Sequence, residues 1–190
     1  MDLKVEVSRK IMHVSSCVLG FSILYFDRGL YIPVLLVITV LTVLLDFSRI
    51  HYEPVRKIFN IFFNIFTRDS EYNQITGASF LFIGGSIVAI IFDQEVASAG
   101  MLILSFSDSS AAIVGILFGN TKLFNKSLEG SMAFFVTSFV VLHLLGFGLI
   151  QNLLVCLITT IVELLSSYKY NDNITIPLSA CISIYLTNLI

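Results

Sequence analysis

The sequence predicts an all-α membrane protein, a polytopic helix bundle with about seven transmembrane helices and one amphipathic helix at the membrane surface. Three observations predict it. The 190 residues are 56% hydrophobic and only 13% charged, and their mean hydropathy is +0.92. A soluble domain of this length cannot bury so much apolar surface. The apolar residues form seven runs, and the basic residues between the runs gather on one side.

The seven apolar runs are the expected membrane-spanning helices. Several have about 16–18 residues, near the lower limit for crossing roughly 30 Å of hydrocarbon. No linker, repeat or low-complexity stretch divides the chain, so we expect one integral membrane domain over residues 1–190. The runs cover residues 11–26, 30–47, 76–92, 96–118, 131–150, 152–167 and 174–190.

The charges between these runs predict the orientation. With the N-terminus in the cytoplasm, ten of the eleven lysines and arginines lie on the cytoplasmic side, and only Arg28 lies outside. This is the positive-inside pattern. The net charge of −2 is not that of a nucleic-acid-binding protein. The three cysteines lie in apolar runs without CxxC spacing, so we expect buried free thiols.

Residues 53–66 differ from the spans because they are amphipathic. One helical face carries apolar side chains and the other carries basic and amide side chains, and Pro54 suits a helix start. This pattern predicts a helix that lies in the cytoplasmic interface, with a helix packed on the bundle as the alternative. The apolar face comprises Val55, Ile58, Phe59, Phe62 and Phe66, and the polar face Arg56, Lys57, Asn60 and Asn64.

The stretch from Ser105 to Ser131 carries the most informative polar residues. Asp108 lies near the middle of the run 96–118, where an unpaired carboxylate would cost several kcal/mol. It must therefore face a polar cavity, a partner or a cation. Gly115 and Gly119 follow four residues apart, which suits either helix packing or close approach of the backbone to a phosphate. A short polar loop then supplies Lys122, Lys126, Ser127 and Gly130.

Three further polar groups are expected at the cytoplasmic side. Glu6, Arg9 or Lys10, and His13 share one helical face, with membrane-edge anchoring and a local ion pair as the alternative. Asp46 with Arg49 suits either a site or a helix-end ion pair. Glu163 lies inside an apolar run, and Asp172 and Asn173 precede the last run, where capping is the alternative. Carboxylate and amide oxygens suit Mg²⁺, and lysine and arginine suit phosphate oxygens. The sequence therefore predicts a membrane-embedded phosphotransfer site.

These segments resemble the motifs of the polyprenol kinase family, which includes dolichol kinase, phytol and farnesol kinase, and CTP-dependent diacylglycerol kinase. The resemblance covers most of the chain. One departure is Ile116, where members often carry an arginine. The matching motifs are ExxRKxxH (Glu6, Arg9, Lys10, His13), DxxR (Asp46, Arg49), SDxxAxxxGxxxGxxK (Ser107, Asp108, Ala111, Gly115, Gly119, Lys122), KSxxGS (Lys126, Ser127, Gly130, Ser131), Glu163, and DNxxxP (Asp172, Asn173, Pro177).

The resemblance implies an enzyme that moves the γ-phosphate of CTP to a lipid alcohol with Mg²⁺ or another divalent metal. The acceptor would be a polyprenol, dolichol, phytol, farnesol or diacylglycerol. Catalytic roles are implied for Asp108, Lys126 and His13. Nucleotide or phosphate binding is implied for Arg9, Lys10, Gly115, Gly119, Lys122, Lys126, Ser127 and Gly130. Metal binding is implied for Asp108, Glu163, Asp172 and Asn173, and Glu6, Asp46 and Arg49 are further site candidates.

Two alternatives remain open. The central motif also resembles part of phosphatidate cytidylyltransferase, although the C-terminal signature of that family is missing. Intramembrane charges also occur in ion-coupled transporters, but here they cluster at one face instead of crossing the bilayer. We expect a prokaryotic cell membrane protein whose site faces the cytoplasm. Its partners would be a lipid alcohol, a nucleoside triphosphate and the bilayer, with no nucleic acid, and the pattern is compatible with a homo-oligomer.

Overall fold

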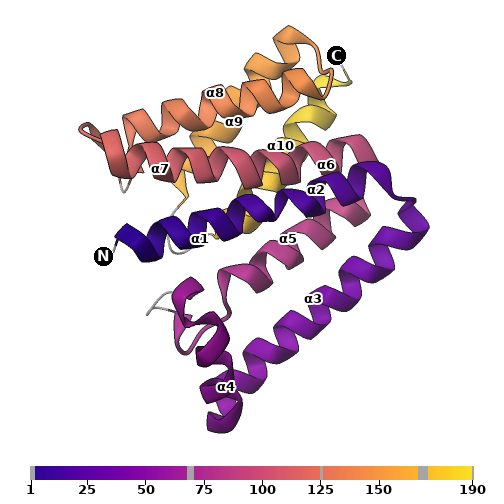
Figure 1. Cartoon of the computed structure of the whole chain (residues 1–190). Helices are drawn as coiled ribbons and strands as arrows, with labels where there is room; N and C mark the ends of the chain where they lie inside the picture. The colour runs from indigo at the N-terminus through magenta and orange to yellow at the C-terminus, as the bar shows by residue number, and fades with distance from the viewer. Residues whose placement is uncertain (1–2, 68–70, 125, 167–170, 190) are drawn as a thin grey trace.

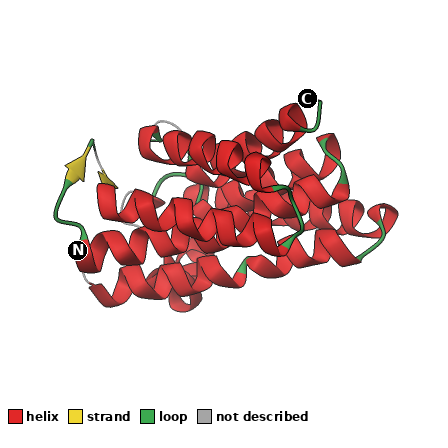
Figure 2. Ribbon diagram, turned by 90° about the horizontal axis from the view of Figure 1, so that it is seen from above, coloured by secondary structure: helices red, strands yellow, loops and turns green. Residues whose placement is uncertain are grey.

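The computed structural model describes residues 3–67, 71–124, 126–166 and 171–189. They form a helix bundle with one small β-hairpin (Figures 1 and 2). The elements are α1 (Leu3–Ser15), α2 (Cys17–Tyr25), α3 (Arg28–His51), α4 (Glu53–Phe63), η1 (Asn64–Phe66), α5 (Gly77–Ile91), α6 (Gln94–Ile103), η3 (Leu104–Asp108), α7 (Ser109–Phe118), β1 (Lys122–Leu123), β2 (Lys126–Ser127), α8 (Leu128–Leu144), α9 (Leu149–Leu165) and α10 (Asp172–Thr187).

The described parts of the apolar runs lie mainly in helix, which confirms the all-α prediction. The predicted boundary between the runs 131–150 and 152–167 is wrong, because α8 ends at Leu144 and α9 begins at Leu149. Two continuous helical segments are long and apolar enough to cross a membrane, Arg28–His51 and Gln94–Phe118. Three other apolar helices are shorter, Gly77–Ile91, Leu128–Leu144 and Leu149–Leu165. By length and composition, the described residues therefore supply two candidate spans, and a bundle of seven spans stays a prediction.

The helix α6 forms the centre of the bundle. All its residues from Val96 to Ile103 are buried, between α2, α5, α8 and α10. Gly100 lets α10 approach closely, because a Cβ there would lie 2.6 Å from Cys181 Sγ and 2.9 Å from the Pro177 carbonyl oxygen. Cys156 and Cys181 are buried, and all three cysteines are free, as predicted.

Two irregularities interrupt the predicted helices. The run 11–26 is broken at Ser16, whose N–H and hydroxyl both donate to the His13 carbonyl, at 3.1 and 2.6 Å. The run 96–118 widens into the π-helical turn η3, which ends at Asp108. Such turns are rare and often mark functional sites. Both breaks depend on hydroxyl contacts that hydropathy does not reveal.

The two ends of the bundle differ in charge. In Figure 1 the start of α1 and α4 lie toward one end, and the α2–α3 turn and the C-terminus lie toward the other. Figure 2 shows the β-hairpin at the end where the N-terminus lies. Arg28 is the first residue of α3, at the α2–α3 turn. The basic residues Arg49, Arg56 and Lys126 belong to the first end. These basic residues therefore lie at the end opposite Arg28, and the orientation of the chain in a membrane stays a prediction; Arg68 and Lys169 lie outside the described residues.

The predicted amphipathic segment is helical, as α4 followed by η1. Phe59 is buried, and the Arg49 guanidinium lies 4.9 Å from the centre of its ring. Ile58, Ile61 and Phe62 are exposed. One side of α4 therefore packs on the end of α3, while an apolar side stays uncovered and suits the membrane interface. Its position in that interface remains a prediction.

Candidate active site

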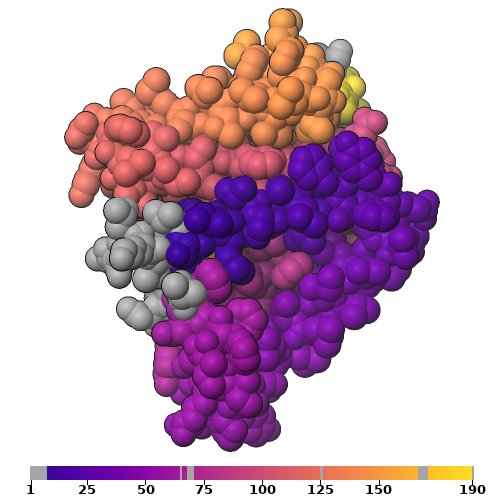
Figure 3. All heavy atoms as spheres, in the orientation of Figure 1, coloured from indigo at the N-terminus to yellow at the C-terminus, as the bar shows by residue number. Residues whose placement is uncertain are grey.

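Asp108 lies at the end of the π-helical turn and pairs with two side chains of α1. Its Oδ2 is 2.6 Å from Lys10 Nζ and 3.4 Å from His13 Nε2. The contact with His13 is too poorly aligned to be a hydrogen bond. Lys10 and His13 are three residues apart, so they face the same side of α1. In the space-filling view, α1 and α2 lie between α7–α8 above and α3–α4 below (Figure 3). The structure confirms that Asp108 faces a cation.

Buried hydroxyl groups hold the turn that carries Asp108. Ser105 Oγ lies 2.7 Å from Ser16 Oγ, at the break between α1 and α2. Ser107 Oγ accepts a hydrogen bond of 2.9 Å from Ser138 of α8. Ser109 Oγ donates to the Ser105 carbonyl at 2.8 Å. These contacts connect η3 to neighbours on two sides and position the carboxylate. The sequence showed the serines around Asp108 but not their partners.

A second group of charges surrounds Lys126, the first residue of β2. Lys126 Nζ is 2.7 Å from Glu163 Oε1 of α9 and 3.3 Å from Asp172 Oδ2 of α10. Burial lowers the pKa of the Lys126 ammonium, but the carboxylates of Asp172 and Glu163 outweigh burial and raise that pKa above its ordinary value. The amine is therefore held charged, at a point where the hairpin meets two helices.

The two groups form one charged cluster. Asp108 interacts electrostatically with Lys126, and His13 with Asp172. Ser131 Oγ donates to Glu163 Oε2 at 3.1 Å and Ser166 Oγ accepts from Lys126 at 3.0 Å, two contacts that the sequence did not indicate. We call this set the charged cluster: Lys10, His13, Asp108, Lys126, Glu163 and Asp172.

Glycines in α7, at its end and in the first turn of α8 let α7 pack against the start of α8. A Cβ on Gly119 would lie 2.2 Å from the Gly115 carbonyl oxygen and 2.8 Å from Ser127 Oγ. A Cβ on Gly130 would lie 2.8 Å from the Ala111 carbonyl oxygen. Ser127 Oγ accepts from the Gly130 N–H at 3.1 Å and so caps α8. These contacts support the packing role for the glycines, which the sequence had left as an alternative.

Lys122 and Arg9 border the cluster differently. Lys122 is exposed on β1, which pairs with β2 through Leu123 and Lys126. The sequence did not predict this hairpin. Arg9 is half-buried beside Lys10 on α1. Glu6 belongs to α1, but its side chain lies outside the described part of the chain.

Asp46 and Arg49 lie away from this cluster and form a structural clamp. Asp46 Oδ1 is 2.7 Å from Arg49 Nε, and its Oδ2 accepts from the Thr76 N–H, the Thr76 hydroxyl and the Ser79 hydroxyl. Arg49 also donates to the carbonyls of Glu71 and Gln74. Both carboxylate oxygens are thus committed, and the pair ties α3 to the start of α5. The geometry favours the helix-end ion pair over a phosphate site.

The four suggested metal ligands do not gather into one cage. Asn173 Nδ2 donates to the Gly77 carbonyl at 2.7 Å, so this side chain ties α10 to α5, and Asn171 instead caps α10. Lys126 occupies the space between Glu163 and Asp172. Within the ranges described above, no group of three or more His, Cys, Asp or Glu side chains is placed to hold a metal ion.

Comparison with known proteins gives relatives along nearly the whole chain. It is 34% identical to the uncharacterized protein RP860 of Rickettsia prowazekii, over 96% of this chain and 94% of that protein. It is 30% identical to the uncharacterized protein MJ1137 of Methanocaldococcus jannaschii, over 90% of this chain and 88% of that protein.

A third relative has a described activity. The CTP-dependent diacylglycerol kinase 1 of Schizosaccharomyces pombe is 33% identical over 70% of this chain, which spans 63% of that kinase. No family model matches the chain, and no solved structure matches it significantly. The chain therefore belongs to the family that includes RP860 and MJ1137, and it is a homologue of the CTP-dependent diacylglycerol kinase of Schizosaccharomyces pombe.

Proposed function

We propose that this protein is a CTP-dependent lipid kinase that transfers the γ-phosphate of CTP to the hydroxyl group of a membrane lipid. The acceptor is an isoprenoid alcohol such as a polyprenol, dolichol, phytol or farnesol, or it is diacylglycerol. The observation that carries the proposal is the charged cluster, which sits among apolar helices at the basic end of the bundle. Homology to a CTP-dependent diacylglycerol kinase supports both the nucleotide and the lipid class of acceptor.

The lysines of the cluster suit the phosphate groups. Lys10 and Lys126 are each held by carboxylates in the described structure. Phosphate oxygens would compete with those carboxylates for the same ammonium groups, so the ion pairs keep both lysines in place before the nucleotide binds. We assign the outer phosphates to Lys122, which is exposed on β1. Arg9, beside Lys10, adds positive charge on the same helix.

The reaction needs positioning more than covalent chemistry. The lipid oxygen forms a bond to the γ-phosphorus while the bond from that phosphorus to the bridging oxygen breaks, and CDP leaves. The hydroxyl proton passes to solvent or to a nearby carboxylate or imidazole. The transition state is loose, so charge neutralisation by Lys10 and Lys126 is the main contribution of the protein. His13 and Asp108 are the nearest paired groups for the proton.

A divalent metal fits two residues of the cluster. Lys10 and His13 approach the same oxygen of Asp108, and Lys126 approaches one oxygen of Asp172. Each carboxylate can therefore offer its other oxygen to a metal ion. Glu163 uses both of its oxygens, for Lys126 and Ser131, and fits less well. Mg²⁺ on a nucleotide needs only one or two protein carboxylates, and when bound it neutralises charge on the phosphates.

We further propose that all seven apolar helical segments cross the membrane, with the N-terminus and the charged cluster on the cytoplasmic side of a prokaryotic cell membrane. Support comes from the elements that carry Arg49, Arg56 and Lys126, which lie at one end of the bundle. This orientation brings a water-soluble nucleotide and a lipid hydroxyl to the same place, since the hydroxyl lies at the inner membrane surface.

Purified protein in lipid nanodiscs tests the activity. CTP labelled at the γ-phosphate is offered with diacylglycerol, farnesol, phytol and polyprenols, with and without EDTA. Label in a lipid, lost with EDTA and restored by Mg²⁺, is the expected result. With CTP labelled at the α-phosphate and phosphatidate as acceptor, label in the lipid would instead identify a cytidylyltransferase. Absence of transfer to every acceptor contradicts the proposal.

A further inference from the structure

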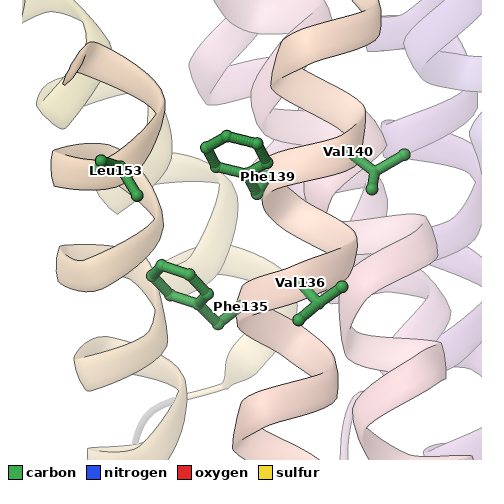
Figure 4. Close-up of a pocket in the computed structure, with 5 residues that line it drawn as sticks. All are labelled: Phe135, Val136, Phe139, Val140 and Leu153. Carbon is green, nitrogen blue, oxygen red and sulfur yellow. The ribbon is translucent and has the colours of Figure 1, made fainter. Parts of the chain in front are cut away.

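An apolar groove runs between α8 and α9 on the outer surface of the bundle. It has a volume of about 290 Å³, and its lining is Phe135, Val136, Phe139 and Val140 of α8 with Leu153 of α9. Figure 4 shows the rings of Phe135 and Phe139 directed toward α9, with Leu153 on the facing side of the gap. The groove has room for a segment of hydrocarbon chain and offers it no polar group along its length.

One end of the groove points toward the charged cluster. Ser131, Phe135 and Phe139 are four residues apart along α8, so they follow one side of the helix. Ser131 donates to Glu163, which holds Lys126. At a rise of 1.5 Å per residue, Phe135 lies about 6 Å along the helix axis from Ser131. A chain in the groove therefore has its end little more than one helical turn from the Ser131–Glu163 contact.

Along α9, Thr160 lies in sequence between the groove residue Leu153 and the cluster residue Glu163, and its hydroxyl has no partner in the described residues. Thr160 is seven residues from Leu153, two turns along the same side of α9. Its Oγ1 is buried and makes no hydrogen bond within the described residues. Buried hydroxyl groups nearly always have partners, and a threonine in a helix can usually bond to a carbonyl of the preceding turn, as Thr159 does here. Thr160 is thus available to bond an oxygen of a bound molecule.

We infer that this groove binds the hydrocarbon chain of the acceptor lipid, with the lipid hydroxyl directed past Thr160 toward Lys126 and Glu163. The inference rests on the proposed lipid kinase function. It names the α8–α9 face as the side from which the lipid enters. The arrangement suits a lipid of the inner leaflet, whose head lies at the basic end of the bundle and whose tail runs toward the middle of the membrane.

A matched pair of variants tests the groove. Leu153 and Leu154 are adjacent and both exposed on α9, but only Leu153 lines the groove. Leu153→Trp fills it and is expected to lower kcat/KM for a long-chain alcohol by about 10-fold. The kcat/KM for a short-chain version of the alcohol and the KM for CTP should be unchanged. Leu154→Trp should behave as wild type. An equal effect of both variants, or none of Leu153→Trp on chain-length preference, overturns the inference.

Photocrosslinking separates the groove from the activity. A lipid alcohol with a diazirine in its chain is incorporated into nanodiscs, and crosslinked peptides are identified by mass spectrometry. The expected result is labelling of α8 and α9 at the groove. Unlabelled alcohol should suppress this labelling, and Leu153→Trp should abolish it. That result supports the inference even if no phosphate transfer is found. The inference is overturned if labelling occurs elsewhere or if unlabelled alcohol does not suppress it. A protein–protein crosslink at the groove also overturns it, because the occupant is then a second copy of the protein.

Discussion

Lys10 Nζ lies 2.6 Å from Asp108 Oδ2, although the two residues are 98 positions apart in the chain. The contact joins α1 to the π-helical turn of the central helix. It neutralises a carboxylate that apolar surroundings would otherwise penalise by several kcal/mol. The same carboxylate lies close enough to Lys126 to interact with it, so one acid connects the first helix to the hairpin that carries Lys126.

Asp108→Asn should abolish phosphate transfer and leave the protein folded. The amide keeps the shape of the side chain and can still accept a hydrogen bond from Lys10, but it removes the negative charge. We expect a loss of about 100- to 1000-fold in kcat, measured with γ-labelled CTP. Circular dichroism and size-exclusion chromatography should be unchanged. Near-normal transfer by a folded variant would remove Asp108 from the site.

Asp46→Asn should lower the stability of the protein and leave phosphate transfer intact while the protein is folded. Asp46 is as buried as Asp108, but its partners are Arg49 and the start of α5. Removing its charge leaves the buried Arg49 guanidinium unpaired, which costs about 3–5 kcal/mol in the free energy of unfolding. The measurement is the thermal unfolding temperature, with transfer assayed well below it. A variant of normal stability that has lost activity would return Asp46 to the site.

Lys126→Met should lower kcat by about 100-fold or more, because it removes a charge directed at the phosphates. Lys57→Met is the matched control. Lys57 is 76% exposed and its contact with Glu53 is long, at 3.8 Å, so its loss should change neither activity nor stability. Equal activity of the two variants would show that Lys126 only supports the structure.

Gly119→Ala should disrupt the junction between α7 and the hairpin. The added methyl group would collide with the Gly115 carbonyl and with Ser127 Oγ, so the chain must shift there. We expect a lower unfolding temperature together with a higher KM for CTP. Gly148→Ala is the control, since a Cβ at Gly148 meets nothing within 4 Å, and its effect should stay below about 1 kcal/mol. Indistinguishable behaviour of the two variants contradicts this account.

The kcat of transfer should not fall through deprotonation of Lys126 at any pH below about 10. Its pKa is raised in the folded protein, so the ammonium form is the more stable one there. The stabilising contribution of the charged amine is complete below the ordinary lysine pKa of about 10.4 and is lost only as pH rises through the higher folded value. The measurement is kcat from pH 7 to 10, with protein integrity checked at each pH.

Local features of the sequence determined the helical class. Apolar runs bounded by polar turns are visible residue by residue, and their described parts lie mainly in helix in the structure. The amphipathic segment is helical for the same reason, because the alternation of apolar and polar side chains at helical spacing is a local property. Even the charge difference between the ends of the bundle follows from the order of the runs, since each new run reverses the chain direction.

Packing decided which polar residues work together. Asp46 and Asp108 look alike in the sequence, as acids in or next to apolar runs. Only the tertiary structure shows that Asp46 has all its oxygens occupied, while Asp108 shares a cluster with Lys126. Such partners come from segments dozens of residues apart, and hydropathy carries no information on the distance between them.

The sequence by itself therefore determined the helical class, and it showed which charged residues were candidates for a site. The break at Ser16, the π-helical turn at Asp108, the hairpin that carries Lys126 and the groove at Phe135 were decided by tertiary structure. The physical reason is the range of the forces. Burial of apolar side chains acts through local periodicity, whereas hydrogen bonds and ion pairs need two groups within about 3 Å, which only the folded chain provides.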